Sequence, residues 1–205
     1  MPDQSNQSMD RNETPPARLS LNATEYAFIS AVADTMIPAD DLSPSGTDCG
    51  VAVFGDRQLA SAWGGGAKLY RDGPFDKGEP EQGYQLPMTP RAFFAVGIAE
   101  MNTWCIETYG ATFDRLSGTD RTAALTALES GKAKIPSIGG KMFFDALLGI
   151  VMEGFFADPI YGGNRDKVSW AMIGFPGLPA FYGDKMDEWR GKPYVVPPKS
   201  ITDLL

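Results

Sequence analysis

Apolar residues recur at helical spacing along most of this chain, and no segment alternates between apolar and polar residues for long enough to predict a strand. The first apolar repeat follows Asn22, whose side chain suits a helix N-cap, and Glu25 three residues later completes a capping-box pattern. Pro38 marks the end of that helix. The chain is therefore predicted to be all-α.

Similar boundary signals predict four further helices. They start at about Asp48, at Thr89-Pro90, at Ser117 and at about Gly140, and the last three end at Gly110, Gly131 and Phe156. The second helix is expected to carry on one side Val51, Phe54, Leu59, Ala62 and Trp63. Residues 140–156 are apolar nearly all round, which is typical of a helix at the centre of a bundle. The expected fold is an irregular helical bundle of about five main helices, with long loops and an irregular C-terminal segment.

The domain organisation follows from composition. Residues 1–19 are rich in Gln, Asn, Ser, Pro and Arg, which predicts a disordered N-terminal arm. Residues 20–205 are expected to form a single helical domain, because a chain of this length can bury one core. Within that domain, residues 64–90 form an excursion rich in Gly, Pro, Asp and Glu without a periodic pattern. Irregular segments of this length tend to serve a function or contact a partner.

Several functional classes are disfavoured by composition. The chain contains no histidine, which excludes Ser-His-Asp and Cys-His nucleophile systems and removes the commonest metal ligand. A net charge of −8 speaks against nucleic-acid binding, because phosphate contacts need clustered Lys and Arg. No apolar run is long enough to span a bilayer. Residues 1–18 lack an apolar signal core and a twin-arginine pair, so no export signal is expected in this sequence.

The remaining candidates for chemistry are two cysteines and two carboxylates. Cys49 and Cys105 are too far apart for a CxxC motif, and either one disulfide or two buried free thiols would fit them. Asp145 and Glu153 lie two helical turns apart, where paired carboxylates could act as acid and base. Capping or pairing with a neighbouring loop is the better interpretation of these carboxylates. We therefore expect no catalytic, cofactor-binding or metal-binding residue in this chain.

The densest pattern in the sequence is a pair of turn-rich segments near the C-terminus, Asp158-Pro-Ile-Tyr-Gly-Gly-Asn164 and Trp170-Ala-Met-Ile-Gly-Phe-Pro-Gly177, which together hold four glycines and two prolines. Pro159 restricts Asp158 to extended backbone, the two glycines permit positive φ, and Asn164 tolerates a left-handed turn. Pro176 and Gly177 suit the two central positions of a turn. Two such devices so close together favour a shaped recognition loop over a plain connection.

These segments resemble the signature of the gluconate 2-dehydrogenase subunit 3 family. Upstream features agree with the resemblance, namely Ile37-Pro-Ala-Asp40, Ser43-Pro44, Gly73-Pro74-Phe75, Phe113, Leu116, Asp120 and Glu153-Gly-Phe-Phe-Ala157. The similarity covers about residues 20 to 180. It implies a small, assembly or chaperone-like subunit of an FAD-dependent oxidoreductase complex that acts on CH–OH groups of a sugar, glycoside or sugar acid.

The resemblance also implies the partners. A large flavoprotein of the glucose–methanol–choline type would bind FAD and oxidise the substrate in a heterodimer, with a cytochrome c or an iron–sulfur centre as electron acceptor. The family implies a periplasmic complex; the expected lack of an export signal leaves a cytoplasmic location as the alternative. This chain itself is expected not to be catalytic, and to bind no cofactor.

We expect the surface that faces the flavoprotein to be formed by the turn-rich segments, together with the 64–90 excursion. The residues expected at this interface are Asp158, Tyr161, Gly162, Gly163, Asn164, Trp170, Gly174, Phe175, Pro176 and Gly177. Tyr161, Trp170 and Phe175 would suit the centre of an interface, where aromatic anchors contribute most. Three alternatives remain open: the block merely packs against the central helix, the chain is a free-standing carbohydrate-binding helical module, or it is a cofactor-free enzyme that uses Asp145, Glu153 or Tyr161.

Overall fold

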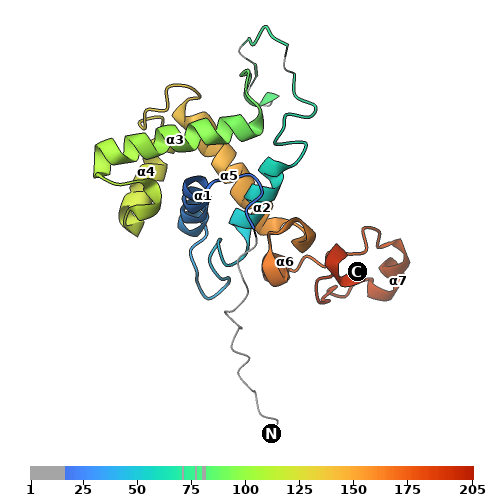
Figure 1. The fold of residues 1–205 in the computed structure, drawn as a ribbon. Coiled ribbons are helices and arrows are strands. Elements are labelled where there is room, and N and C mark those ends of the chain that lie inside the picture. The colour runs from blue at the N-terminus through green and yellow to red at the C-terminus, as the bar shows by residue number, and fades with distance from the viewer. Residues whose placement is uncertain (1–16, 71, 77, 80–81) are drawn as a thin grey trace.

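The described residues of the chain, 17–70, 72–76, 78–79 and 82–205 of a computed structural model, contain seven α-helices, five short 3-10 helices and no strand. The α-helices are α1 (Ala23–Met36), α2 (Val51–Ala60), α3 (Pro90–Tyr109), α4 (Gly118–Glu129), α5 (Gly140–Phe156), α6 (Val168–Ile173) and α7 (Met186–Trp189). The 3-10 helices are η2 (Phe113–Arg115), η3 (Pro159–Tyr161), η4 (Arg165–Lys167), η5 (Gly183–Lys185) and η6 (Ile201–Leu204). Figure 1 shows an irregular bundle of α1 to α5 with two irregular segments outside it. The predicted all-α class is confirmed.

The helices begin where local capping signals predict. The Asn22 side chain accepts from the Glu25 N–H, and the Glu25 carboxylate accepts from the Asn22 N–H, both at 2.9 Å. Thr89 and Ser117 cap α3 and α4 in the same way through their hydroxyl oxygens, and Gly110 ends α3 with a left-handed φ of 82°. These contacts satisfy backbone N–H groups that a helix leaves without partners.

The core lies where α5 crosses α1, α2 and α4, with α3 laid across the bundle (Figure 1). Four fully buried phenylalanines fill its middle: Phe28 of α1, Phe93 of α3, Phe113 of η2 and Phe143 of α5. The ring centroids of Phe28 and Phe113 are 5.1 Å apart, and those of Phe28 and Phe143 are 6.2 Å apart. Burial of large rings at such spacings contributes both apolar area and favourable edge contacts.

Helix α5 is central, but it is not enclosed on all sides. It buries Phe143, Leu147 and Val151 completely, while Met142, Leu148 and Met152 remain 38–44% exposed on the opposite side. Helix α5 contacts α1, α2 and α4, so its central position agrees with the prediction, but the apolar side chains on one of its sides stay partly exposed.

Helix α2 also differs from its expected extent. It starts at Val51, not at Asp48, because residues 46–50 form hydrogen-bonded turns and Gly50 has a left-handed φ of 84°. Val51, Phe54 and Leu59 lie on the helix and are buried, but Ala62 and Trp63 lie beyond it and are exposed, Trp63 by 43%. The placement of these two residues on the same side of the helix was wrong because the helix ends at Ala60.

The chain is tied to the bundle directly before α1. The buried Asp56 carboxylate of α2 accepts three backbone N–H groups, from Leu19, Ser20 and Leu21, at 2.6–2.9 Å. The expected N-terminal arm, residues 1–19, falls mostly outside the described residues; at its end, Leu19 is held by Asp56. In addition, Arg91 of α3 makes a bidentate ion pair with Glu25 at 2.7 and 3.1 Å, which joins α3 to the start of α1.

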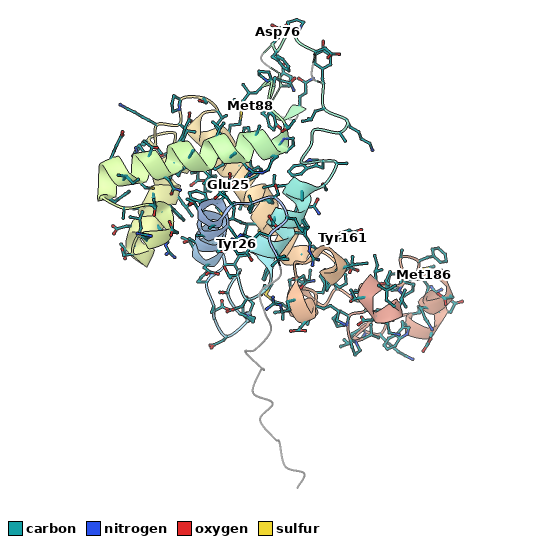
Figure 2. The ribbon with its side chains drawn as sticks, viewed as in Figure 1. Glu25, Tyr26, Asp76, Met88, Tyr161 and Met186 are labelled. Carbon is teal, nitrogen blue, oxygen red and sulfur yellow. The ribbon has the colours of Figure 1, made fainter. Side chains whose placement is uncertain are left out.

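Two irregular segments extend from opposite ends of the bundle. The segment between α2 and α3 carries Asp76 at its far end, and the C-terminal segment after α6 carries Met186 (Figure 2). The C-terminal segment leaves the body after α6 and returns to it through η6, which contacts η3, and a bridge between Gly177 and Lys199 joins its two ends. Tyr161 lies where this segment meets the bundle (Figure 2).

Candidate functional site

The first turn-rich segment begins with Asp158, which connects three parts of the chain. Its backbone is extended, at φ −65° and ψ 134°, as the following proline requires. One carboxylate oxygen accepts from the N–H of Ile160 at 3.0 Å and caps η3, and the other accepts from the N–H of Ile201 at 2.9 Å. Asp158 therefore fixes the C-terminal residues to the end of α5.

The two glycines that follow allow close approach of backbone segments. Gly162 has a φ of 99°, a left-handed conformation that favours glycine. A Cβ atom on Gly163 would collide with the carbonyl oxygen of Gly154 in α5, and one on Gly50 would collide with the carbonyl oxygen of Gly162. The Arg165 N–H donates to the carbonyl of Cys49, the residue before Gly50, at 2.9 Å. The segment thus packs by backbone contact against both α5 and the start of α2.

Asn164 holds the second half of this segment in place. It is fully buried, with a left-handed φ of 44°. Its side-chain NH₂ donates to the carbonyl of Ala157 at 3.0 Å, and its side-chain oxygen accepts from both the N–H and the hydroxyl of Ser169, at 3.0 and 2.7 Å. The amide therefore links the end of α5 to the first turn of α6, and all of these polar groups are satisfied inside the protein.

The next residues carry unusual backbone conformations beside a charged notch. Asp166 and Lys167 have φ values of 58° and 59°, which cost free energy for non-glycine residues and persist only where the surroundings hold them. Lys167 is held by an ion pair with Asp203 of η6 at 2.8 Å. The notch, a cavity of about 490 Å³, is lined by Val53, Arg57, Pro159, Gly162, Gly163, Arg165, Asp166, Lys167, Thr202 and Asp203. Arg57 crosses it and donates to the carbonyl of Ile160 at 3.3 Å.

Trp170 of α6 is anchored inside its own chain. Only 7% of it is exposed, and its indole N–H donates to the carbonyl of Phe156 at 2.9 Å. The Phe175 ring packs against its edge, with centroids 5.1 Å apart and planes at 81°. Phe175 keeps 44% of its surface exposed. Of these two expected anchors, only Phe175 therefore offers a substantial surface to another protein.

The second turn-rich segment closes as its residue types predict. Gly174 ends α6 with a φ of 70°, and Gly177 follows Pro176 with a φ of 69°, as the third residue of a turn after proline requires. Gly177 pairs with Lys199 in an isolated parallel bridge, and the carbonyl of Pro176 accepts from the Lys199 N–H at 3.0 Å. The turn thus serves as the base of the C-terminal segment.

The exposed apolar side chains of the region define what it can offer to a partner. Tyr161 is 51% and Ile173 57% exposed, and Met172 and Phe175 are each exposed by about two fifths. We call these four residues the apolar site. Met172 and Ile173 were not predicted. A short apolar helix that buries Trp170 must leave other apolar residues outside, and this signal could have identified them.

The other candidate residues are separate from this region. Asp145 is exposed and pairs with Lys141 one turn away at 3.0 Å, and it makes no hydrogen bond to Glu153. Partial burial raises the pKa of the Glu153 carboxyl, although its side chain still reaches the surface. Cys49 and Cys105 are both free and buried, and burial raises the pKa of both thiols, to about 12 for Cys105. Thiols in this state are poor nucleophiles.

Within the part of the chain that the structure describes, no group of three acidic or cysteine residues is placed to hold a metal ion, and no helix is both long and apolar enough to cross a membrane. The tip of the 64–90 excursion lies apart from the apolar site: Figure 2 shows Asp76 at the far end of the excursion, away from Tyr161, which lies where the C-terminal segment meets the bundle.

Comparison with known proteins gives one match. The family described as gluconate 2-dehydrogenase subunit 3 matches residues 23–177, which run from the start of α1 to the turn that follows α6. No curated protein and no solved structure matches the chain. The match includes both turn-rich segments and ends where the C-terminal segment begins.

Proposed function

The chain belongs to the gluconate 2-dehydrogenase subunit 3 family, and we propose that it binds and stabilises the large, FAD-carrying subunit of a dehydrogenase complex. In this proposal, it takes no part in the oxidation itself. The substrate of such a complex would be a sugar, glycoside or sugar acid. The partner would be a flavoprotein of the glucose–methanol–choline type.

The apolar site is the observation that carries this proposal. Its four side chains, Tyr161, Met172, Ile173 and Phe175, stand exposed on a support that is built for rigidity. Gly163 is in backbone contact with α5, and the side-chain amide of the buried Asn164 is fully hydrogen-bonded. Exposed apolar side chains on a pre-organised surface favour a protein partner, because little conformational entropy is lost on docking.

The chemistry of the complex is assigned to its other subunits. Hydride transfer from a CH–OH group to a flavin needs the flavin itself and a base, and both would come from the large subunit. A cytochrome c or an iron–sulfur centre would accept the electrons. We place the complex in the periplasm, as a heterodimer of this chain and the flavoprotein with any electron-accepting subunit attached. Of the candidates for chemistry in this chain, the two thiols are buried and Asp145 is paired with Lys141.

The apolar site is tested by co-purification with the flavoprotein. We expect Tyr161→Ala combined with Phe175→Ala to reduce the yield of the complex at least about tenfold, because exposed aromatic anchors each contribute roughly 1–2 kcal/mol or more to an interface. Trp170 is left unchanged because its replacement would disturb the fold. The yield is measured as flavoprotein retained on a tagged small subunit.

Ile106→Ala is the matched control. Ile106 of α3 is 51% exposed, like Tyr161, but it lies outside the apolar site. We expect this variant to bind as the unmodified chain does. Equal retention by the double variant and the Ile106 control, with both folded by circular dichroism, would show that the apolar site does not contact the flavoprotein.

A further inference from the structure

Residues 178–199, here called the C-terminal loop, leave the bundle and return to it at a single point. The Leu178 N–H donates to the carbonyl of Lys199 at 2.8 Å, and the Lys199 N–H donates to the carbonyl of Pro176 at 3.0 Å. The whole loop lies outside the matched range, residues 23–177. Figure 1 shows it as an extension beyond α6 that contains α7. The loop is therefore an addition to the bundle that the family match does not include.

The loop has an aromatic centre of its own. The Tyr194 ring packs edge-on against Tyr182 and Trp189, with centroids 5.7 and 4.9 Å apart and planes at 74° and 87°. The Tyr182 hydroxyl donates to the carbonyl of Gly177 at the base, at 2.6 Å. Helix α7 packs against η5 within the same loop. These contacts hold the loop as one unit, so that its surface is presented in a defined shape.

This aromatic centre borders a pocket with a basic rim. The pocket has a volume of about 430 Å³ and is lined by Tyr182, Lys185, Met186, Trp189, Arg190, Lys192 and Tyr194. No carboxylate lines it. Arg190 and Lys185 make ion pairs with Asp187 and Glu188 at 2.7 and 3.8 Å, but the four side chains are 44–93% exposed. Such surface pairs are weak and can be exchanged for another carboxylate.

The charge of this region differs from that of the rest of the chain. Residues 178–205 contain four basic and four acidic residues, so the net charge of −8 belongs entirely to residues 1–177. An acidic partner segment would be repelled by the net charge of residues 1–177 and would bind best where several cations lie together without a lining carboxylate. The pocket is one of these places, because its lining cations are Lys185, Arg190 and Lys192.

We propose that this pocket is a second docking point for the flavoprotein, which binds an acidic segment of that subunit. An apolar side chain of the segment would fit between Tyr182, Trp189 and Tyr194, and its neighbouring carboxylates would pair with the basic rim. Trp, Tyr and Arg are the residue types that contribute most at protein interfaces. Phe181 and Val195, 76% and 81% exposed, add apolar surface on the same loop. The inference rests on the function proposed above.

The position of the loop favours the same partner as the apolar site. Helix η6, which follows the loop, is held by Asp158, which accepts from the Ile201 N–H, and by the ion pair between Lys167 and Asp203. The base of the loop is thus continuous with the segment that carries Tyr161. A flavoprotein seated on the apolar site would have the C-terminal loop beside it.

The basic rim is tested by binding measurements between the purified full chain and the purified flavoprotein. The test variant carries Lys185→Glu, Arg190→Glu and Lys192→Glu. We expect its Kd to rise about tenfold or more at low salt, because several weak surface ion pairs are replaced by repulsion. The difference from the unmodified chain should shrink as salt is added, since salt screens exposed charges.

Two further variants complete the test. Lys132→Glu, Lys134→Glu and Lys141→Glu make the same change in net charge at exposed positions outside the loop, and this control should bind within about twofold of the unmodified chain. A chain with residues 179–198 replaced by a short Gly-Ser linker should lose binding as strongly as the rim variant. Its bundle should keep its helical signal, because the buried core lies within residues 21–157, outside the replaced segment.

The outcomes separate the two proposals. Normal binding by the rim and linker variants, with binding lost in the Tyr161 and Phe175 double variant, would overturn the loop as a docking point and leave the proposed function standing. An equal loss in the rim variant and the Lys132 control would also overturn it, since only net charge would then matter. Absence of binding by the unmodified chain would overturn the proposed function, and the loop proposal with it.

Discussion

At the scale of single residues, the turn-rich segments contain some residues that pack against the bundle and others that are exposed. Asn164 and Gly163 are turned inward and join the segment to α5, while Tyr161 is turned outward. The interpretation as a packing element and the interpretation as a recognition loop therefore apply to different residues of one segment. The inward residues fix where the outward residues stand.

Asn164 allows this division to be measured. We expect Asn164→Ala to lower the free energy of unfolding by about 2–4 kcal/mol, because it leaves buried backbone and hydroxyl groups without partners. Asn102 is the matched control: it is also buried, but its side-chain oxygen accepts only from the Phe113 N–H, at 3.0 Å. Asn102→Ala should cost less. Chemical denaturation of both variants gives the comparison, and a smaller cost at Asn164 would contradict the role assigned to it.

At the scale of elements, local signals predicted the helices well. Asn22, Thr89 and Ser117 each cap a helix through contacts within three residues, so their effect can be read from the sequence without knowledge of the fold. The exposed face of α5 could not be predicted in this way. Met152 is as apolar as its buried neighbours, and only the positions of α1, α2 and α4 decide which side is covered.

The turns of the candidate site were predicted from the sequence, but the burial of its residues and its long-range contacts were not. The residue types at 158–164 and 174–177 indicated turns, and the observed φ values of Gly162 and Gly177 agree. Burial of Trp170 depends on a hydrogen bond to Phe156, and the C-terminal loop depends on contacts such as that between Asp158 and Ile201, which lie 43 residues apart. Contacts over such distances leave no periodic pattern in the sequence.

Substitution of two glycines by alanine separates the effect of close packing on stability from the effect of helix propensity. Gly163→Ala should destabilise the protein by about 2–3 kcal/mol, because the new Cβ would force the segment away from the Gly154 carbonyl. Gly149→Ala, in the middle of α5 with open space around it, should stabilise the helix by up to about 1 kcal/mol. Thermal melting of the two variants should shift in opposite directions. A shift in the same direction would contradict the packing assigned to Gly163.

At the scale of the whole molecule, the fold is a helical bundle, and the surface that we propose for binding lies to one side of it. The bundle of α1 to α5 contains the core, and the apolar site and the C-terminal loop both lie beyond α5 (Figures 1 and 2). Among the described residues, the thiols of Cys49 and Cys105 are buried and so are inaccessible to a substrate. The exposed apolar side chains beyond α5 fit the proposed role of a subunit that binds a protein.

The most direct test is to produce the flavoprotein with and without this chain and to measure how much soluble, FAD-loaded large subunit is recovered. Bound flavin is quantified by its absorbance after purification. The account predicts that omission of the chain sharply reduces both soluble flavoprotein and flavin per protein, because the large subunit depends on its partner for stability. Equal recovery of FAD-loaded flavoprotein in the presence and absence of the chain would contradict the assembly function proposed for it.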